Sequence, residues 1–430
     1  MEFAVVDGLR TLKFDLVLTL ALAAGALFVG GAVQRRVGVL KRASIPAAAV
    51  GGLLFALVVL ALRRWGALGV VLDTSLLLPL QTVFFTTIGL GATVGLLRAG
   101  GWRMGFFLLI ATLLAVVQNV AGVGIARAIG APAPLGIICG ALTLTGGPAT
   151  GLAWADRFEA LGIQGAGAFI IAAATFGIFL SNLVGNPIAT ALIRRFRLAA
   201  PRAAHTRNES EDEFWAIGAM GGAGAEEEAQ AERRPARGEL DGGELLRQLL
   251  IVLALMGVGA LLSLGLTRVL APWGVTLPGY IGAMICAALV RFVADRGNLF
   301  KLDERAIELI AVVALALFLV LALMNLKLWQ LAGLALPMIV ILVAQIVLTI
   351  AYCALITFTL MGRDYEAAVT TSGHIGFGLG TTANAVANME ALVARYAPAP
   401  RSFLVVPVVG AFFIDLTNAL VITLFVNLVR

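Results

Sequence analysis

Charged residues are scarce in this chain, and their scarcity excludes a soluble protein. Only 13% of the 430 residues are Asp, Glu, Lys or Arg, whereas 60% are hydrophobic, and the mean hydropathy is +0.98. A soluble domain of this length needs far more polar side chains to cover its surface. We therefore predict an integral membrane protein in contact with the lipid bilayer.

The chain also lacks the residue patterns that enzyme and metal sites need. Its three cysteines, Cys139, Cys286 and Cys353, each lie inside an apolar segment and none has CxxC spacing. Neither a disulfide framework nor a metal site is indicated. No Ser-His-Asp order and no paired carboxylates occur, and Gly376-Phe-Gly-Leu-Gly380 lacks the strand and the acidic residue that accompany a nucleotide loop. We predict no enzymatic activity and no cofactor.

The about ten-residue alternation typical of membrane β-barrels is absent too, while apolar stretches long enough to cross a bilayer as helices recur throughout. The net charge of +6 comes from Lys and Arg in short loops between these stretches. Retention of basic residues on the cytoplasmic side explains this charge better than binding of nucleic acid. The sequence predicts an all-α polytopic fold.

Candidate spans fall into two sets of five. The first stretch follows Arg10 and Lys13 and is interpreted as a retained helix rather than a signal peptide, because of its length and the many spans after it. The first set is Phe14 to Val33, Ile45 to Leu62, Leu76 to Leu97, Met104 to Ile129 and Gln164 to Ile193. The second set is Leu245 to Leu270, Leu277 to Val293, Ala306 to Trp329, Leu334 to Leu360 and Phe403 to Val429.

Two glycine-rich segments, Pro134 to Trp154 and Glu366 to Leu392, interrupt the apolar pattern between the fourth and fifth span of each set. Each is expected to form a re-entrant hairpin or a broken helix, as in secondary transporters. At a shift of roughly 231 to 233 residues several short stretches align, which favours an internal duplication. The aligned stretches are Leu97-Arg-Ala-Gly100 with Gln330-Leu-Ala-Gly333, Gly147-Pro-Ala-Thr150 with Gly378-Leu-Gly-Thr381, and Asn186 with Asn418.

The distribution of basic residues favours, by a small margin, inverted halves with re-entrant segments. Both termini are then periplasmic. We expect an N-terminal membrane repeat over residues 1–196, a flexible cytoplasmic linker over 197–243 and a C-terminal membrane repeat over 244–430.

Asp415 is the exception to the absence of charge inside the predicted spans. A carboxylate at that depth costs several kcal/mol unless it is protonated, paired or bound to a cation, and no Lys or Arg lies at comparable depth. Na⁺ accepts carboxylate, hydroxyl and amide oxygens. The predicted Na⁺-binding residues are Asp415, Asn388, Asn418, Thr417, Gln118 and Asn119. A structural role for the carboxylate, and H⁺ coupling through Asp415 or His374, stay open as alternatives.

An anionic substrate would have to be bound without a deep arginine. Exposed N–H groups and the positive ends of helix dipoles at the two interruptions are suited to this role. The predicted substrate-binding residues are Thr145, Gly146, Gly147, Thr150, Gly151, Ser372, His374, Gly378, Gly380, Thr381, Thr382 and Asn384. Glycine and threonine also mediate helix packing, and a neutral histidine can simply hydrogen-bond within a turn.

Several stretches resemble the bacterial sodium/glutamate symporter family, which is distantly allied to the citrate-type hydroxycarboxylate symporters. They are Phe84-Phe-Thr-Thr-Ile-Gly-Leu90, Leu97-Arg-Ala-Gly-Gly101, Val117-Gln-Asn119, Leu326-Lys-Leu-Trp329, Leu336-Pro-Met338, Gly373-His-Ile-Gly-Phe-Gly-Leu-Gly380, Ala387-Asn-Met389 and the run from Phe403 to Ile422. The resemblance implies an inner-membrane symporter that imports glutamate with Na⁺ by elevator-like alternating access. It also implies two inverted five-helix halves, each with a re-entrant segment, and a homodimer.

The chain departs from this family in both glycine-rich segments. Relatives usually read Gly-Gly-His-Gly-Thr in the first, where this chain has Gly146-Gly-Pro-Ala-Thr150, and Ala-Thr-Pro-Thr in the second, where it has Thr381-Thr-Ala-Asn384. These departures therefore lie where the substrate is expected to be recognised, and they are Pro148, Ala149, Ala383 and Asn384. Aspartate or a dicarboxylate stays open as the substrate. A channel or a non-transporting receptor is the alternative class, although a channel is expected to show a continuous polar stripe that these spans lack.

Overall fold

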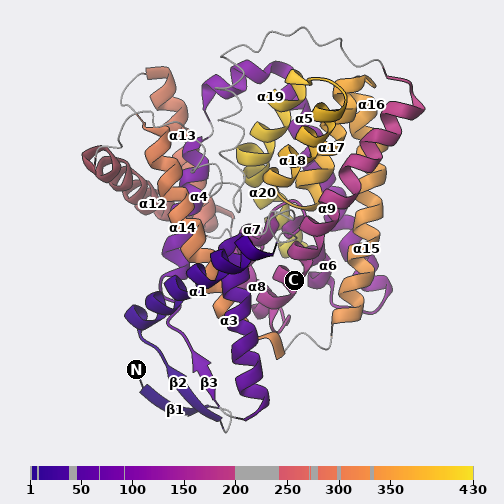
Figure 1. The fold of residues 1–430 in the computed structure, drawn as a ribbon. Helices are drawn as coiled ribbons and strands as arrows, with labels where there is room; N and C mark the ends of the chain where they lie inside the picture. Colours follow the sequence, from indigo (N-terminus) through magenta and orange to yellow (C-terminus); the bar gives the residue numbers. More distant parts are fainter. Residues whose placement is uncertain are drawn as a thin grey trace.

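Long apolar helices dominate the structure, a computed structural model that describes residues 2–6, 9–37, 46–66, 68–91, 93–198, 242–270, 272, 279–297, 302–329 and 334–429 (Figure 1). Eight helices in these ranges are long and apolar enough to cross a membrane, which confirms the predicted polytopic α-helical class. They are α1 (Leu16–Arg36), α3 (Ala47–Arg64), the Gly101–Ala128 part of α5, α9 (Ala166–Arg195), α12 (Gly242–Leu270), α14 (Glu304–Met324), the continuous Ala335–Leu360 and the continuous Pro400–Leu428.

Two of the continuous helices contain a π-helical turn. The first consists of α15 (Ala335–Tyr352), η5 (Cys353–Thr357) and α16 (Phe358–Leu360). The second consists of α19 (Pro400–Val408), η6 (Val409–Phe413) and α20 (Ile414–Leu428). Such turns add a residue to the helix and are frequent at functional sites.

The two remaining predicted spans are less regular. Leu277 to Val293 corresponds to α13 (Gly279–Gly297), whose C-terminal part carries Arg291, Asp295 and Arg296. Leu76 to Leu97 is wrong as one helix, because α4 (Leu77–Gly91) has only 15 residues and α5 (Val94–Ala128) starts a new helix. α5 itself kinks at Gly101, which has a φ of 57°.

A small sheet at the N-terminus was not anticipated from the sequence. β1 (Glu2–Val6) pairs antiparallel with β2 (Leu9–Lys13), and β3 (Gly69–Val71) adds parallel to β2. The Phe14 N–H donates to Val71 O at 2.9 Å, and the Asp73 N–H donates to Thr19 Oγ1 at 3.2 Å. These bonds fix the start of α1 against the connection between α3 and α4.

The helices form two bundles that face one another (Figure 1). The first bundle consists of α1, α3, α4, α12, α13 and α14, and the second of α5 to α9 and α15 to α20. Glycines bring helix backbones close together inside the first bundle. A Cβ atom at Gly30 of α1 would lie 2.1 Å from Ala47 O of α3, and one at Gly89 of α4 would lie 2.3 Å from Met284 O of α13.

Both glycine-rich segments fold as helical hairpins within the second bundle. Hairpin 1 consists of α6 (Ala133–Ile137), η1 (Ile138–Leu142), α7 (Gly147–Ala153) and α8 (Ala155–Ala160), and hairpin 2 of α17 (Tyr365–Leu379) and α18 (Thr382–Arg395). In hairpin 2 the Tyr365 hydroxyl at the start of α17 donates to Ala397 O just after α18. The two arms of hairpin 2 therefore begin and end together.

The hairpins start from opposite ends of the bundle. The open end of hairpin 2 lies in an apolar cluster with Met104, just after the Gly101 kink of α5, and Leu192 near the end of α9. Hairpin 1 lies along the other halves of those helices, since Gly136 packs on Gly122 of α5 and Gly151 packs on Ile170 of α9. Figure 1 shows α6 and α8 in its lower half and α16 and α19 near its top. The tips of the hairpins consequently approach one another inside the bundle.

The predicted linker over residues 197–243 lies almost entirely outside the described residues. Arg197 and Leu198 follow α9, and α12 begins at Gly242.

Candidate functional site

Glycine shapes the tips of both hairpins. Gly147 at the tip of hairpin 1 has a φ of 68°, a left-handed conformation that disfavours other residues. A Cβ atom there would lie 3.7 Å from Gly380 O and 3.9 Å from Thr381 Cγ2 at the tip of hairpin 2. The two tips are therefore in contact, although they come from distant parts of the chain.

Thr381 caps the helix that leaves the tip of hairpin 2. Its backbone is extended, and its Oγ1 accepts a long hydrogen bond from the Asn384 N–H at 3.4 Å and donates to Asn384 Oδ1 at 2.6 Å. The first N–H groups of an α-helix have no partner within the helix. The start of α18 thus directs N–H groups and the positive end of a helix dipole to the point where the hairpins meet.

The side chain of Gln118 of α5 forms hydrogen bonds with both hairpins near their tips. Its Nε2 donates to Gly378 O of hairpin 2 at 2.8 Å and to Thr349 Oγ1 of α15 at 3.1 Å. Its Oε1 accepts from Thr145 Oγ1 of hairpin 1 at 2.7 Å. The backbone carbonyl oxygen of Gln118 accepts from Gln345 Nε2 at 2.6 Å. Since all of these side chains are buried, this amide holds both tips in a fixed relation.

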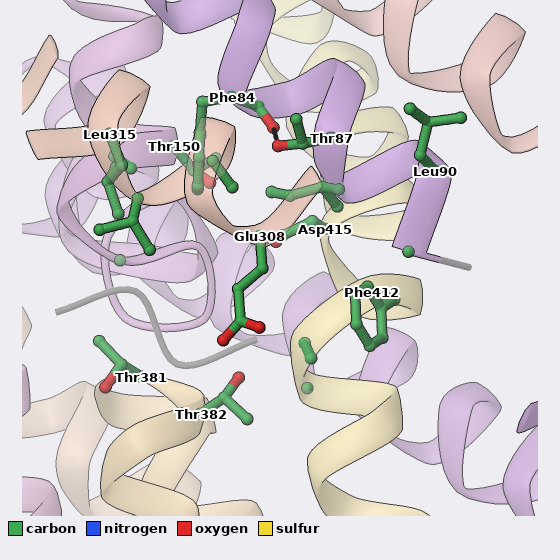
Figure 2. A pocket seen from close by; sticks show the side chains of 18 of the residues that line it. Phe84, Thr87, Leu90, Thr150, Glu308, Leu315, Thr381, Thr382, Phe412 and Asp415 are labelled. Carbon is green, nitrogen blue, oxygen red and sulfur yellow. Dashed lines mark hydrogen bonds between the residues drawn. The ribbon is translucent and has the colours of Figure 1, made fainter. Parts of the chain in front are cut away.

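A cavity of about 330 Å³ lies between the tips and the first bundle. The tips contribute Thr145 to Thr150 and Gly380 to Thr382, and the η6–α20 helix contributes Gly410, Ala411, Phe412 and Asp415. The opposite wall comes from α4, including Phe84 and Thr87, from α14, including Glu308 and Leu315, and from Arg291 of α13. Figure 2 shows Thr150, Thr381, Thr382, Phe412 and Asp415 around this space.

Eight of the residues predicted for substrate and Na⁺ line this cavity. They are Thr145, Gly146, Gly147, Thr150, Gly380, Thr381, Thr382 and Asp415. Asp415 stands in the first turn of α20, directly after the π-helical turn of η6. A carboxylate, several hydroxyls and a helix N-terminus are thereby collected at one place.

The other ten predicted residues do not line the cavity. Ser372, Asn384 and Asn388 hold hairpin 2 on α9: Ser372 Oγ donates to Asn186 Oδ1 at 3.1 Å, Asn384 Nδ2 to Ile178 O at 3.5 Å and Asn388 Nδ2 to Ser181 O at 3.1 Å. Gly151 and Gly378 pack on Ile170 and Leu114. These contacts fix the position of the tips rather than present groups to a ligand.

Asn119 and Asn418 hold hairpin 1 in a comparable way. Asn119 Oδ1 accepts from the Ala141 N–H, and Asn418 Nδ2 donates to Ala141 O, both at 3.0 Å. Asn119 and Asn418 are fully buried. Thr417 instead contacts α5, since Thr112 Oγ1 donates to its hydroxyl at 2.9 Å. Gln118 belongs to the same group of supporting residues, because its side chain hydrogen-bonds both hairpins.

His374 lies away from the cavity, inside an aromatic cluster. Its Nδ1 is 2.8 Å from Thr357 Oγ1, and its ring packs on Phe107 and Phe377 with centroid separations of 5.1 and 5.0 Å. The side chain is fully buried. These surroundings correspond to the alternative interpretation of a histidine hydrogen-bonded within the fold.

Three charged residues of the cavity wall were not predicted. Arg291 of α13 forms ion pairs at 2.8 Å with Asp295 and with Glu304, and Glu304 and Glu308 lie one turn apart on α14. In the sequence these residues fall near span ends, where charge is ordinary. The spacing of Glu304 and Glu308, four residues apart at the start of an apolar helix, was the available signal that both lie on one face.

Comparisons with known proteins identify relatives of this chain. A sequence profile of the family described as "Sodium/glutamate symporter" matches residues 12–398. The chain is 38% identical to a "Sodium/glutamate symporter" of Escherichia coli (strain K12) over 421 residues, which are 96% of this chain and 98% of that protein. It is 36% identical to the protein of the same name from Haemophilus influenzae over 402 residues, which are 93% of this chain and 94% of that protein. Among solved structures, the sodium proton antiporter MjNhaP1 from Methanocaldococcus jannaschii matches with a TM-score of 0.40 and 14% identity, covering 97% of this chain and 98% of that chain.

Proposed function

The chain belongs to the sodium/glutamate symporter family, and from this membership we propose that it takes up L-glutamate, or a related small carboxylate, together with Na⁺. The observation that carries the proposal is the meeting of two glycine-rich hairpin tips at a cavity that also contains Asp415. Broken helices of this kind bind anions and cations in secondary transporters. Because the chain belongs to a transporter family, an enzymatic activity is not proposed.

We propose that the substrate carboxylates bind at the hairpin tips. The start of α18 supplies N–H groups and a positive dipole end, and Thr145, Thr150, Thr381 and Thr382 supply hydroxyls. Gly146, Gly147 and Gly380 permit close approach of the backbone. Ser372, His374, Gly378, Asn384 and Gly151, predicted for the same role, act in this proposal by holding the tips.

We propose Asp415 as the principal Na⁺ ligand. A carboxylate inside a membrane bundle is costly without a cation. Thr382, which has a hydroxyl oxygen, and Gly410, which has a backbone carbonyl oxygen, line the same cavity. Asn388, Asn418, Thr417, Gln118 and Asn119 support the surrounding helices. Na⁺ compensates the charge of Asp415 in this proposal, and the protein moves when both ligands are bound and not with one ligand alone.

The proposed architecture consists of two inverted repeats, residues 1–196 and 244–430, joined by a linker over residues 197–243. Opposite chain directions of α5 and α15–α16 support the inversion, because Met104, just after the Gly101 kink of α5, and Phe358, near the end of the continuous α15–α16 helix, lie in one apolar cluster. The hairpins are then re-entrant from opposite sides. We propose that the second bundle moves against the first, elevator-like, in a homodimer of the bacterial inner membrane, with both termini periplasmic and the linker cytoplasmic.

Uptake of labelled glutamate into proteoliposomes, with and without an inward Na⁺ gradient, tests the function. We expect accumulation above the external concentration only when the gradient is present. Equal uptake in both conditions would exclude Na⁺ coupling. Accumulation driven by an inward H⁺ gradient in the absence of Na⁺ would establish the alternative, H⁺ coupling.

A further inference from the structure

Seven exposed arginines gather at one end of the second bundle, where α9 ends and hairpin 2 begins. In the sequence they flank members of the apolar cluster that contains Met104, Leu192, Phe358 and Leu392. Figure 1 shows α16 and α19, which adjoin this surface, near its top. The surface is termed the basic end, and it consists of Arg103, Arg194, Arg195, Arg197, Arg363, Arg395 and Arg401.

Carboxylates do not balance the charge of the basic end. Among the described residues, the segments that carry it contain three carboxylates, Asp364, Glu366 and Glu390. Two of these accept backbone hydrogen bonds: Asp364 from the Ala367 N–H at 2.7 Å and Glu366 from the Ser402 N–H at 3.0 Å.

The neighbouring helices of the first bundle do not share this excess of positive charge. The start of α12, the end of α13 and the start of α14 meet in one apolar cluster together with Leu90 at the end of α4. Four arginines stand there with five carboxylates, and they are Arg247, Arg291, Arg296 and Arg305 with Glu244, Asp295, Asp303, Glu304 and Glu308. Retention of basic residues on one side of the membrane acts on both bundles alike, so it does not explain why the excess is confined to the second.

Aromatic side chains place the basic end at the depth of lipid headgroups. Trp102 and Phe196 are exposed beside Arg103 and Arg195, and the Arg103 guanidinium lies 5.9 Å from the ring centroid of Trp102. Arg195 stands in the last turn of α9, a helix long enough to cross a membrane. Tryptophan and arginine at the ends of such helices are typical of the membrane–water interface. A soluble anion would leave both rings in water, whereas a phospholipid covers them with its acyl chains.

Two of the arginines occupy backbone positions that favour glycine. Arg197 follows α9 with a φ of 49°, and Arg363 follows α16 with a φ of 55°. Among the residues that the structure describes, no other residue except glycine has a positive φ. The two turns are neighbours, since the ring centroids of Phe196 and Phe358 are 5.4 Å apart. Glycine is the usual left-handed residue after a helix, so arginine at both turns indicates a role for the side chains.

We propose that the basic end binds the headgroups of anionic phospholipids. The guanidinium groups pair with phosphate oxygens, which suit the fork of N–H donors that arginine presents. The rings of Trp102 and Phe196 contact the first part of the acyl chains. Anionic lipid therefore associates with the second bundle in preference to α12, α13 and α14 of the first. This inference goes beyond the proposed function and does not depend on the substrate or on Na⁺ coupling.

Thermal stabilisation of the purified full-length protein by lipid in a neutral detergent tests the proposal. Dioleoylphosphatidylglycerol is compared with dioleoylphosphatidylcholine, which has the same acyl chains and a zwitterionic headgroup. A lipid that binds the folded protein raises its denaturation midpoint by mass action, and we expect phosphatidylglycerol to raise it further than phosphatidylcholine. In the triple variant Arg194→Gln, Arg195→Gln and Arg197→Gln, the phosphatidylglycerol concentration for half-maximal stabilisation should rise about tenfold or more, since three attractions to headgroups are lost together.

A matched triple variant controls for the general loss of positive charge. Arg64→Gln, Arg127→Gln and Arg268→Gln remove three exposed arginines from the last turns of α3, α5 and α12, outside the basic end. This variant should respond to phosphatidylglycerol like the wild type. If the first triple variant does not fold, the double variant Arg363→Gln and Arg395→Gln tests the same surface from the side of hairpin 2, with the same expected direction.

Equal stabilisation of the wild type by the two lipids overturns the inference, as does an unchanged titration in the variants of the basic end or an equal weakening in the control. Inorganic phosphate that reproduces the effect of phosphatidylglycerol would also overturn it, because the surface would then bind a free anion and not a lipid. The titrations are run in a K⁺ buffer without glutamate. Their outcome is therefore separate from that of the uptake assay.

Discussion

Asp415 combines a negative charge with a place on the cavity wall, and the consequence is testable at this single residue. Asp415→Asn keeps the size of the side chain but removes the charge that we propose binds Na⁺. We expect the Na⁺ concentration for half-maximal uptake to rise about tenfold or more, because the neutral amide binds a cation far less strongly. Asp156→Asn, at an exposed position of α8 outside the cavity, should leave uptake unchanged. Wild-type Na⁺ dependence in Asp415→Asn would contradict the proposed ion site.

Gln118 connects the tips of the two hairpins through hydrogen bonds of a single side chain. Gln118→Leu would leave the Gly378 carbonyl and the Thr145 hydroxyl without this partner, at a cost of about 1–3 kcal/mol for each buried polar group left unpaired. We expect a lower thermal denaturation midpoint and a lower uptake rate. Thr349→Val removes only one of the bonds of Gln118 and no hydrogen bond to either hairpin, so its effects should be clearly smaller. Equal effects of the two substitutions would show that the link between the tips is unimportant.

Residue types predicted the chemistry of the site better than they predicted which side chains face it. Threonine and glycine at the tips were expected, and Thr381 and Gly147 do meet at the cavity. Ser372 also carries a hydroxyl group, but it lies on the face of α17 that contacts α9, where it donates to Asn186. A single sequence does not give the rotation of each arm. Glu308 lines the cavity but was not predicted, because its depth depends on how α14 packs against the hairpins.

At the scale of elements, hairpin 2 depends on very close packing of its two arms. A Cβ atom at Gly376 of α17 would lie 2.4 Å from Ala385 Cα and 2.6 Å from Ala385 N of α18. Gly376→Ala should therefore force the arms apart, at a cost of about 1–3 kcal/mol for overpacking. We expect a lower thermal denaturation midpoint and a reduced rate of uptake.

Gly124→Ala is the matched control for this substitution. Gly124 lies in α5, and a Cβ atom there would have no neighbour within 4 Å. Its denaturation midpoint and uptake should equal or slightly exceed those of the wild type, since alanine is the better helix former. Equal behaviour of the two alanine variants would argue against a tightly packed hairpin.

Most elements were predictable because length and hydropathy define a membrane helix. α9 and α12 begin and end within a few residues of the predicted spans. The break between α4 and α5 was missed because the apolar run continues across it. The π-helical turns η1, η5 and η6 were also not foreseen, since a single inserted residue leaves the composition of a span unchanged. The short sheet lacks the length that gives a strand a clear sequence pattern.

At the scale of the whole molecule, two asparagines that align between the sequence halves each contact the hairpin of the other half. Asn186 of α9 contacts Ser372 of hairpin 2, and Asn418 of α20 contacts Ala141 of hairpin 1. Asn186 and Asn418 were aligned in the sequence. Each hairpin is thus held by an asparagine of the last long helix of the other half, as expected if the halves derive from a duplication and are related by a two-fold axis. This exchange places both tips, and hence the cavity, at the junction of the halves.

The orientation of the molecule in the membrane gives the last prediction. Glu159 of α8 and Arg194 of α9 are exposed and lie toward opposite ends of the second bundle, since α9 runs between them. Cys139, Cys286 and Cys353 are buried, so a cysteine introduced at either position should dominate labelling. With the linker cytoplasmic, an impermeant maleimide should label Glu159→Cys on intact cells and Arg194→Cys only after permeabilisation. The basic residues Arg194, Arg195 and Arg197 next to the linker favour this orientation, because Lys and Arg are retained on the cytoplasmic side. The reverse labelling pattern would invert the topology, and labelling of both positions from outside would contradict the assignment of α9 as a span.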